Sequence, residues 1–141
     1  MRVDFYLLSS SELDARWLLA CRLLEKAYLR GHRVFVYCNT QAEAELIDER
    51  LWTFKADSFI PHNLQGEGPE QSPPIQIGYQ EAPKGFSDIL LNLADDIPSF
   101  YTRFRRVMEI VINDDDAKTL SRARYRVYRS NHCELLTHAM E

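Results

Sequence analysis

The first fifty residues alternate between two hydrophobic patterns, and this alternation constrains the fold more than any other feature. Short apolar runs at residues 3–8 and 32–38 are typical of buried strands. Apolar side chains recur every three or four positions over residues 11–30 and 40–52, as they do in amphipathic helices. The order strand, helix, strand, helix predicts a mostly parallel sheet with helices on both faces, and therefore the α/β class.

Residues typical of helix ends support these boundaries. Ser11, with Asp14 three positions later, predicts a capping box at the start of the first helix, and Gly31 predicts its end. Thr40 is a suitable N-cap for the second helix. The positions of the second helix that we expect to face the core are Ala42, Leu46 and Ile47.

The second half of the chain contains shorter elements around one long loop. Residues 54–74 are rich in proline and glycine and predict a loop, with a short strand near 58–60. The remaining elements predicted are strands at 75–79, 89–93 and 106–112 and helices at 99–104 and 117–130. Because we find no repeat and no linker, we expect residues 1–141 to form a single domain.

Composition places the chain among globular proteins. With 141 residues, of which 45% are hydrophobic, folding buries enough surface for a core without disulfides. No apolar run is long enough to cross a bilayer, and the first residues lack the features of a secretory signal. Three cysteines without a close pair suit a reducing compartment. We therefore expect a cytoplasmic protein with no membrane contact.

The motifs of nucleotide-binding and catalytic α/β proteins are missing. The turn after the first strand has neither G-x-G-x-x-G nor the P-loop pattern, so its backbone cannot approach a pyrophosphate. A lone G-x-G occurs at Gly66-Glu67-Gly68, where the glutamate repels phosphate. His132, Cys133 and His138 lack the spacing of a metal site. We therefore expect no catalytic residue, no cofactor and no metal.

The last predicted helix carries a row of cations at helical spacing, namely Lys118, Arg122, Arg126 and Arg129. Tyr125 lies beside this row. The neighbouring apolar positions, predicted to form the buried side of the helix, are Leu120, Ala123 and Val127. The row of cations is either a solvated surface or a site for a carboxylate-rich ligand, since arginine side chains bind carboxylates in a bidentate manner.

Large apolar residues are also dense around the predicted loop. Trp52 precedes it, and the loop itself contains Phe54, Phe59, Ile60 and Leu64. One interpretation is a small core cluster beneath the loop. The other is an exposed apolar surface that binds a protein partner.

Three segments of the chain resemble one protein family. Leu51-Trp52 followed by Phe59-Ile60-Pro61-His62-Asn63-Leu64-Gln65-Gly66-Glu67-Gly68-Pro69 closely resembles the signature of the chi subunit of bacterial DNA polymerase III. Residues 3–8 and 118–129 are also similar to that family. The resemblance implies a Rossmann-like fold without nucleotide-binding loops. It also implies a non-catalytic accessory subunit of the clamp loader.

The resemblance further implies two partners. One is the small psi subunit, with which chi forms a heterodimer in the clamp loader. The other is the acidic, Phe-terminated C-terminal tail of the single-stranded DNA-binding protein. By resemblance, the psi-contacting residues are Trp52, Phe59, Pro61, His62 and Leu64. The residues that bind the tail are, on the same basis, Lys118, Arg122, Tyr125, Arg126 and Thr137.

Direct binding of single-stranded nucleic acid by the basic C-terminal helix is the alternative function. Residues 101–130 contain eight basic and four acidic residues, a local charge of +4. The whole chain carries −4, so the remainder carries −8. Because an acidic protein repels nucleic acid over most of its surface, we expect little or no direct nucleic-acid binding.

Overall fold

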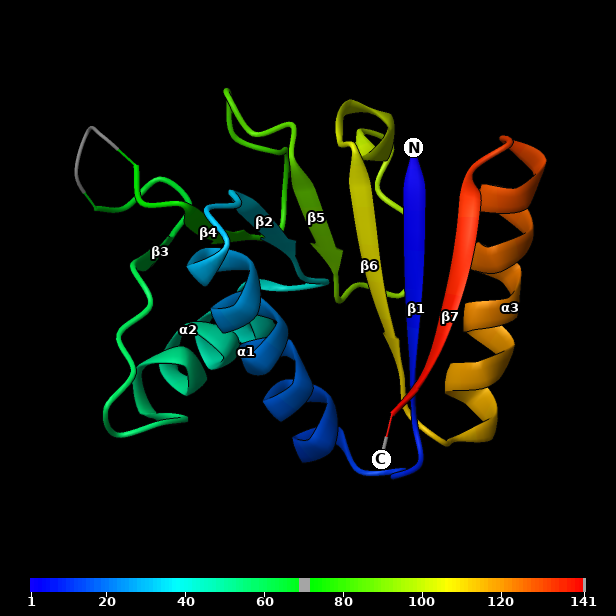
Figure 1. Ribbon diagram of the computed structural model, residues 1–141, viewed down its shortest axis with the longest axis horizontal. Helices are drawn as coiled ribbons and strands as arrows, with labels where there is room; N and C mark the ends of the chain where they lie inside the picture. Colours follow the sequence, from blue (N-terminus) through cyan, green and yellow to red (C-terminus); the bar gives the residue numbers. More distant parts are fainter. Residues whose placement is uncertain (69–71, 141) are drawn as a thin grey trace.

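The computed structural model describes residues 1–68 and 72–140 and forms one parallel sheet flanked by helices (Figure 1). The strands of the described residues are β1 (Arg2–Leu8), β2 (Val34–Tyr37), β3 (His62–Leu64), β4 (Ile75–Gly78), β5 (Ile89–Asn92), β6 (Arg106–Val111) and β7 (Glu134–Met140). The helices are α1 (Leu13–Leu29), α2 (Gln41–Thr53), α3 (Asp115–Ser130) and the short 3₁₀ helix η1 (Tyr101–Arg103).

All neighbouring strands run parallel, in the order β3-β4-β2-β5-β6-β1-β7. The α/β class is therefore confirmed. This order places β3 at one edge of the sheet and β7 at the other. Figure 1 shows the same separation, with α2 and β3 far from α3 and β7. Within the described residues, no helix is long and apolar enough to cross a membrane.

Two hydrophobic cores form, one on each face of the sheet. Successive residues of a strand point to opposite faces, so Tyr6 joins one core and Phe5 the other. The first core contains Leu24 of α1 and Ile47 of α2. The second contains Tyr128 of α3. Helices thus cover both faces of the sheet, as the sequence predicts.

The helix boundaries agree with the sequence at two caps and differ at a third. Thr40 caps α2, accepting a hydrogen bond from the Glu43 amide at 3.2 Å, and Gly31 has a positive φ of 80° after α1. The capping box at Ser11 is wrong, because α1 begins after Glu12, which makes no side-chain cap. Within α2, Ala42 is exposed, whereas the buried positions are Ala44, Ile47 and Leu51.

Three of the short elements also differ from expectation. The strand predicted near 58–60 is instead β3 at His62–Leu64, because those residues align with β4. Only Tyr101–Arg103 turn into η1 within the helix predicted at 99–104. β7 is not predicted from the sequence, and it pairs with β1 along its whole length. The other strands and helices lie within two residues of their predicted ends.

A buried carboxylate links the three strands β6, β1 and β7. The side chain of Asp4 on β1 is fully buried. Arg106 of β6 donates from Nε to Oδ2 of Asp4 at 2.7 Å, and His138 of β7 lies 2.7 Å from Oδ1. Burial alone would raise the pKa of Asp4, but hydrogen bonds from Arg2, His138 and Arg106 outweigh it and hold that pKa below its usual value.

Asp4→Asn should therefore destabilise the protein by about 1–3 kcal/mol at neutral pH, because it removes the charge from several charge-assisted hydrogen bonds. The lowered pKa of Asp4 stabilises the folded state at pH values above the pKa of Asp4 in the unfolded chain, which is about 4. This stabilisation is lost as the pH falls through the pKa of Asp4 in the folded protein. Urea unfolding should show a constant difference from wild type between about pH 5 and 7, shrinking below about pH 4. A difference that grows towards acidic pH would contradict this role.

Candidate functional site

The rotation of α3 about its axis differs from the sequence expectation. Leu120 and Val127, predicted to be buried together with Ala123, are 44% and 45% exposed. The side chains that α3 buries are Ser121, Arg124 and Tyr128. The helix is thus rotated by about 100° from the predicted orientation, counting 3.6 residues per turn.

A buried glutamate on β6 explains this rotation. Glu109 is fully buried and accepts hydrogen bonds from Arg124 Nε at 3.0 Å and from Tyr128 Oη at 2.7 Å. Asn92 of β5 donates a third bond at 3.0 Å. Burial raises the pKa of the Glu109 carboxyl, and the positive charge of Arg124 opposes that rise. A buried carboxylate requires such partners, so α3 turns its polar residues towards the sheet.

This rotation brings one edge of α3 over a pocket at the end of the sheet. The pocket has a volume of about 320 Å³ and is lined by Phe5, Leu7, Leu8, Val111, Ile112, Lys118, Ser121, Arg122, Tyr125 and Thr137. The aliphatic lining comes from β1, β6 and the residue after β6, and the aromatic lining comes from β1 and α3. We call this cavity the α3 pocket.

The structure brings four of the five residues predicted for an acidic ligand to the α3 pocket. Lys118, Arg122 and Tyr125 line it from α3, and Thr137 lines it from β7. Arg126, the fifth, is exposed one turn beyond Arg122 and is not among the lining residues. The apolar lining is not predicted from the sequence, where its signal is the alternation of side chains along the first strand.

The α3 pocket combines positive charge with an apolar interior. Within residues 1–68 and 72–140, neither Lys118 nor Arg122 forms an ion pair. The nearby Asp114 is occupied in capping α3, accepting from the Ala117 amide at 3.0 Å. The Tyr125 ring packs on Phe5 with 5.4 Å between centroids, which fixes it as one wall. Such a cavity suits an aromatic group that carries a carboxylate.

A second candidate surface lies at the other edge of the sheet. Trp52 at the end of α2 is 53% exposed and Phe59 is 65% exposed, and their ring centroids lie 5.7 Å apart. Ile60 is buried in the core, whereas Trp52 and Phe59 face solvent. The binding of a partner to these two rings stays a prediction. We call these two rings the Trp52–Phe59 patch.

The other residues predicted for this surface have different positions. The side chain of His62 is buried, and its ring packs against the ring of Trp52 with 4.5 Å between centroids. Nδ1 of His62 lies 2.6 Å from the Ile60 carbonyl oxygen, which fixes the ring. Pro61 and Leu64 are half-buried beside it. Pro69, the last residue of the sequence motif, lies outside the described residues.

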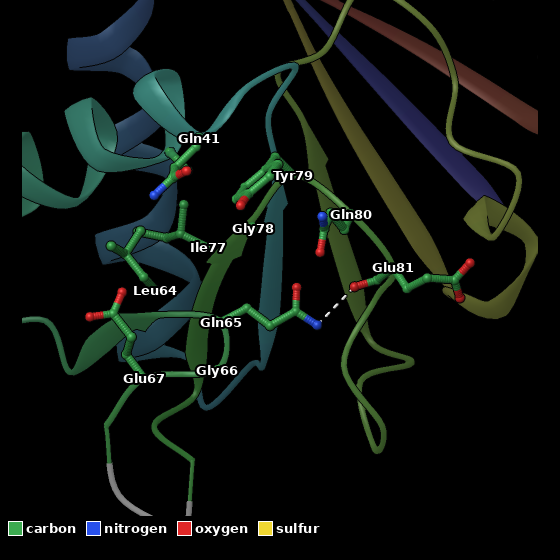
Figure 2. A pocket seen from close by; sticks show the side chains of 11 residues that line it. Gln41, Leu64, Gln65, Gly66, Glu67, Ile77, Gly78, Tyr79, Gln80 and Glu81 are labelled. Carbon is green, nitrogen blue, oxygen red and sulfur yellow. Dashed lines mark hydrogen bonds between the residues drawn. The ribbon is translucent and has the colours of Figure 1, made fainter.

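A third cavity lies beyond the carboxyl ends of β3 and β4, the end of a parallel sheet at which α/β proteins bind ligands (Figure 2). Its volume is about 380 Å³. Gln65 reaches across it and donates to the Glu81 carbonyl oxygen at 2.8 Å, as Figure 2 shows. The described lining residues include Glu67 and Glu81 but neither lysine nor arginine, so the cavity does not favour a phosphate group.

Comparisons with known proteins agree with the resemblance seen in the sequence. Residues 1–136 match the family model described as DNA polymerase III chi subunit, HolC. A curated DNA polymerase III subunit chi from Pseudomonas aeruginosa is 37% identical over 139 residues, which cover 99% of this chain and 96% of the relative. The subunit chi of Escherichia coli is 37% identical over 130 residues, covering 89% of this chain and 88% of that protein.

A third relative extends this agreement to another genus. The DNA polymerase III subunit chi of Haemophilus influenzae is 34% identical over 135 residues, or 95% of this chain and 94% of the relative. The family model spans residues 1–136, which include α2 and α3, and each of the three relatives covers 89% or more of the chain. The chain belongs to the DNA polymerase III chi subunit family.

Proposed function

We propose that this chain is a non-catalytic, cytoplasmic adaptor of the DNA polymerase III clamp loader. In this proposal, the Trp52–Phe59 patch binds the psi subunit. The α3 pocket binds the acidic, Phe-terminated tail of the single-stranded DNA-binding protein. The adaptor would thereby connect the clamp loader to coated single-stranded DNA.

The α3 pocket is the observation that carries the proposal. Its apolar interior accommodates a phenylalanine ring, whose burial is worth about 1.5–3 kcal/mol. Arg122 at its side can bind the terminal carboxylate in a bidentate manner, and Lys118 offers a charge to an upstream aspartate. Ordering a flexible tail opposes these gains, so we expect a dissociation constant in the micromolar range, on the order of −8 kcal/mol.

The separation of the two surfaces supports an adaptor role. The Trp52–Phe59 patch adjoins β3 at one edge of the sheet, and the α3 pocket adjoins β7 at the other. Two partners can therefore bind without touching the same residues. The rings of the patch are exposed, aromatic and close together, as in the centres of protein interfaces.

Direct nucleic-acid binding by α3 is weaker as an alternative. Arg124 is buried in an ion pair with Glu109, so it cannot contact a phosphate. The remaining cations of α3 flank an apolar cavity, which suits the end of a peptide better than a phosphate backbone.

Replacing Arg122 tests the proposed tail site. Arg122→Ala should weaken binding of an acidic peptide ending in phenylalanine about tenfold, because a charge-assisted pair with the terminal carboxylate is lost. Titration calorimetry at about 50 mM salt measures this effect, since surface charges are less screened there. Arg129→Ala is the matched control, because Arg129 is exposed on the same helix and does not line the pocket.

Removing the terminal phenylalanine from the peptide should weaken binding about as much as Arg122→Ala does. Raising the salt to about 0.5 M should weaken the wild-type complex as well. Equal affinity of wild type and Arg122→Ala at low salt would mean that the row of cations is only a solvated surface.

Replacing Phe59 tests the proposed psi surface. Phe59→Ala should abolish copurification with psi, since truncating an aromatic residue at an interface centre commonly costs about 2 kcal/mol or more. Tail-peptide binding and the circular dichroism spectrum should stay unchanged, because the ring is exposed. Leu29→Ala, at another exposed apolar residue, is the control and should retain psi. Unfolding of Phe59→Ala would instead assign Phe59 to the core.

A further inference from the structure

The largest of the cavities described here lies on the face of the sheet opposite to α3. It has a volume of about 580 Å³ and runs between α1 and the strands β1, β6 and β7. The charged and aromatic residues that line it are Arg2, Tyr6, Arg22, Lys26, Arg30, Arg106 and His138. We call this cavity the α1 groove.

Positive charge in the α1 groove exceeds negative charge. Asp4 lies beneath it and is shared by Arg2 and Arg106, so two guanidinium groups meet one carboxylate. Glu134, at the start of β7, adds a second acid near Arg2. The acid next to Lys26 on α1, Glu25, points elsewhere, towards Ser58 and Lys55.

Three further cations form an unpaired row along α1. Arg22, Lys26 and Arg30 are exposed and spaced four residues apart, or about 6 Å along the helix axis. In the part of the chain that the structure describes, none of them forms an ion pair or a side-chain hydrogen bond. Like charges at this spacing destabilise a helix, and a bound anion removes that cost.

An aromatic platform adjoins the cations. The ring of His138 stacks on Tyr6 with 4.8 Å between centroids and 18° between planes. The imidazole is partly open to solvent, since the His138 side chain is 37% exposed. Nε2 of His138 is hydrogen-bonded to Asp4, and the Tyr6 hydroxyl accepts a hydrogen bond from Arg106 at 2.8 Å. These bonds fix both rings of the platform. A fixed planar ring beside a row of cations is the arrangement on which unpaired bases stack.

We propose that the α1 groove binds single-stranded DNA weakly and without sequence preference. The row on α1 contacts successive phosphates, and a base stacks on His138. Leu18, Leu19 and Leu23 also line the groove, so its apolar surface does not by itself exclude a peptide. The planar platform beside a row of unpaired cations is the feature that favours DNA. Membership in a DNA polymerase subunit family agrees with this ligand.

This inference is independent of the proposed adaptor function. Thr137 of β7 lines the α3 pocket, and the next residue, His138, lines the α1 groove on the opposite face. The net charge of −4 led us to expect little direct nucleic-acid binding from the sequence. The net charge does not show how charges are distributed over the surface. The fold brings cations from α1, β1 and β6 together on one surface.

Fluorescence anisotropy of a labelled oligothymidylate tests the proposal. At about 50 mM salt, Arg22→Glu/Lys26→Glu should weaken binding tenfold or more. Lys118→Glu/Arg122→Glu is the matched control, since it changes the net charge equally, and it should weaken binding less than about twofold. If the groove neutralises four phosphates, a fourfold rise in salt should weaken wild-type binding about fiftyfold. Arg22→Gln/Lys26→Gln tests the same site should the charge reversal lower the melting temperature.

Two further measurements distinguish the binding of DNA, with its bases, from the binding of other anionic ligands. His138→Gln keeps a hydrogen-bond donor for Asp4 but removes the ring. It should weaken binding of the oligonucleotide about fivefold and leave competition by inorganic polyphosphate unchanged. Equal weakening by the α1 and α3 variants would overturn the proposal, because binding would then follow net charge alone. Displacement of the oligonucleotide from Lys118→Glu/Arg122→Glu by an acidic peptide would also overturn it, assigning the groove to a protein ligand.

Discussion

The buried carboxylate of Glu109 determines how α3 lies on the sheet. A charge in this position is tolerated only with close partners, and α3 supplies two of them, Arg124 and Tyr128. Satisfying Glu109 fixes the rotation of α3, and that rotation aims Lys118 and Arg122 at the α3 pocket. The geometry of the candidate site therefore follows from an ion pair whose two residues do not line the α3 pocket.

The order of the strands separates the surfaces of the molecule. Because β1 lies between β6 and β7, the chain must cross it through α3, and β7 becomes an edge strand. Successive residues of β7 then line two different cavities on opposite faces of the sheet, the α3 pocket and the α1 groove. The Trp52–Phe59 patch lies at the far edge beside β3. One parallel sheet with its flanking helices thereby presents three surfaces with little overlap.

Local sequence patterns predicted most elements, whereas long-range pairing decided the remainder. Thr40 and Gly31 act through neighbouring backbone groups, so their roles are readable from the sequence. The rotation of α3 depends on an acid fifteen residues away from Arg124, and the apolar residues Leu120 and Val127 misled the prediction. The available signal was Glu109, the one acid within the otherwise apolar run 107–111, since a buried carboxylate requires a cation. No comparable signal marks β7, which forms only by pairing with β1.

The central claim is that the α3 pocket receives an acidic peptide ending in phenylalanine. Amide chemical shifts of the isotope-labelled protein, followed while such a peptide is added, test it most directly. The account predicts the largest changes at residues 118–125 and at Thr137, with the region around Trp52 unaffected. Changes concentrated in the α1 groove or around Trp52, with α3 unaltered, would contradict it.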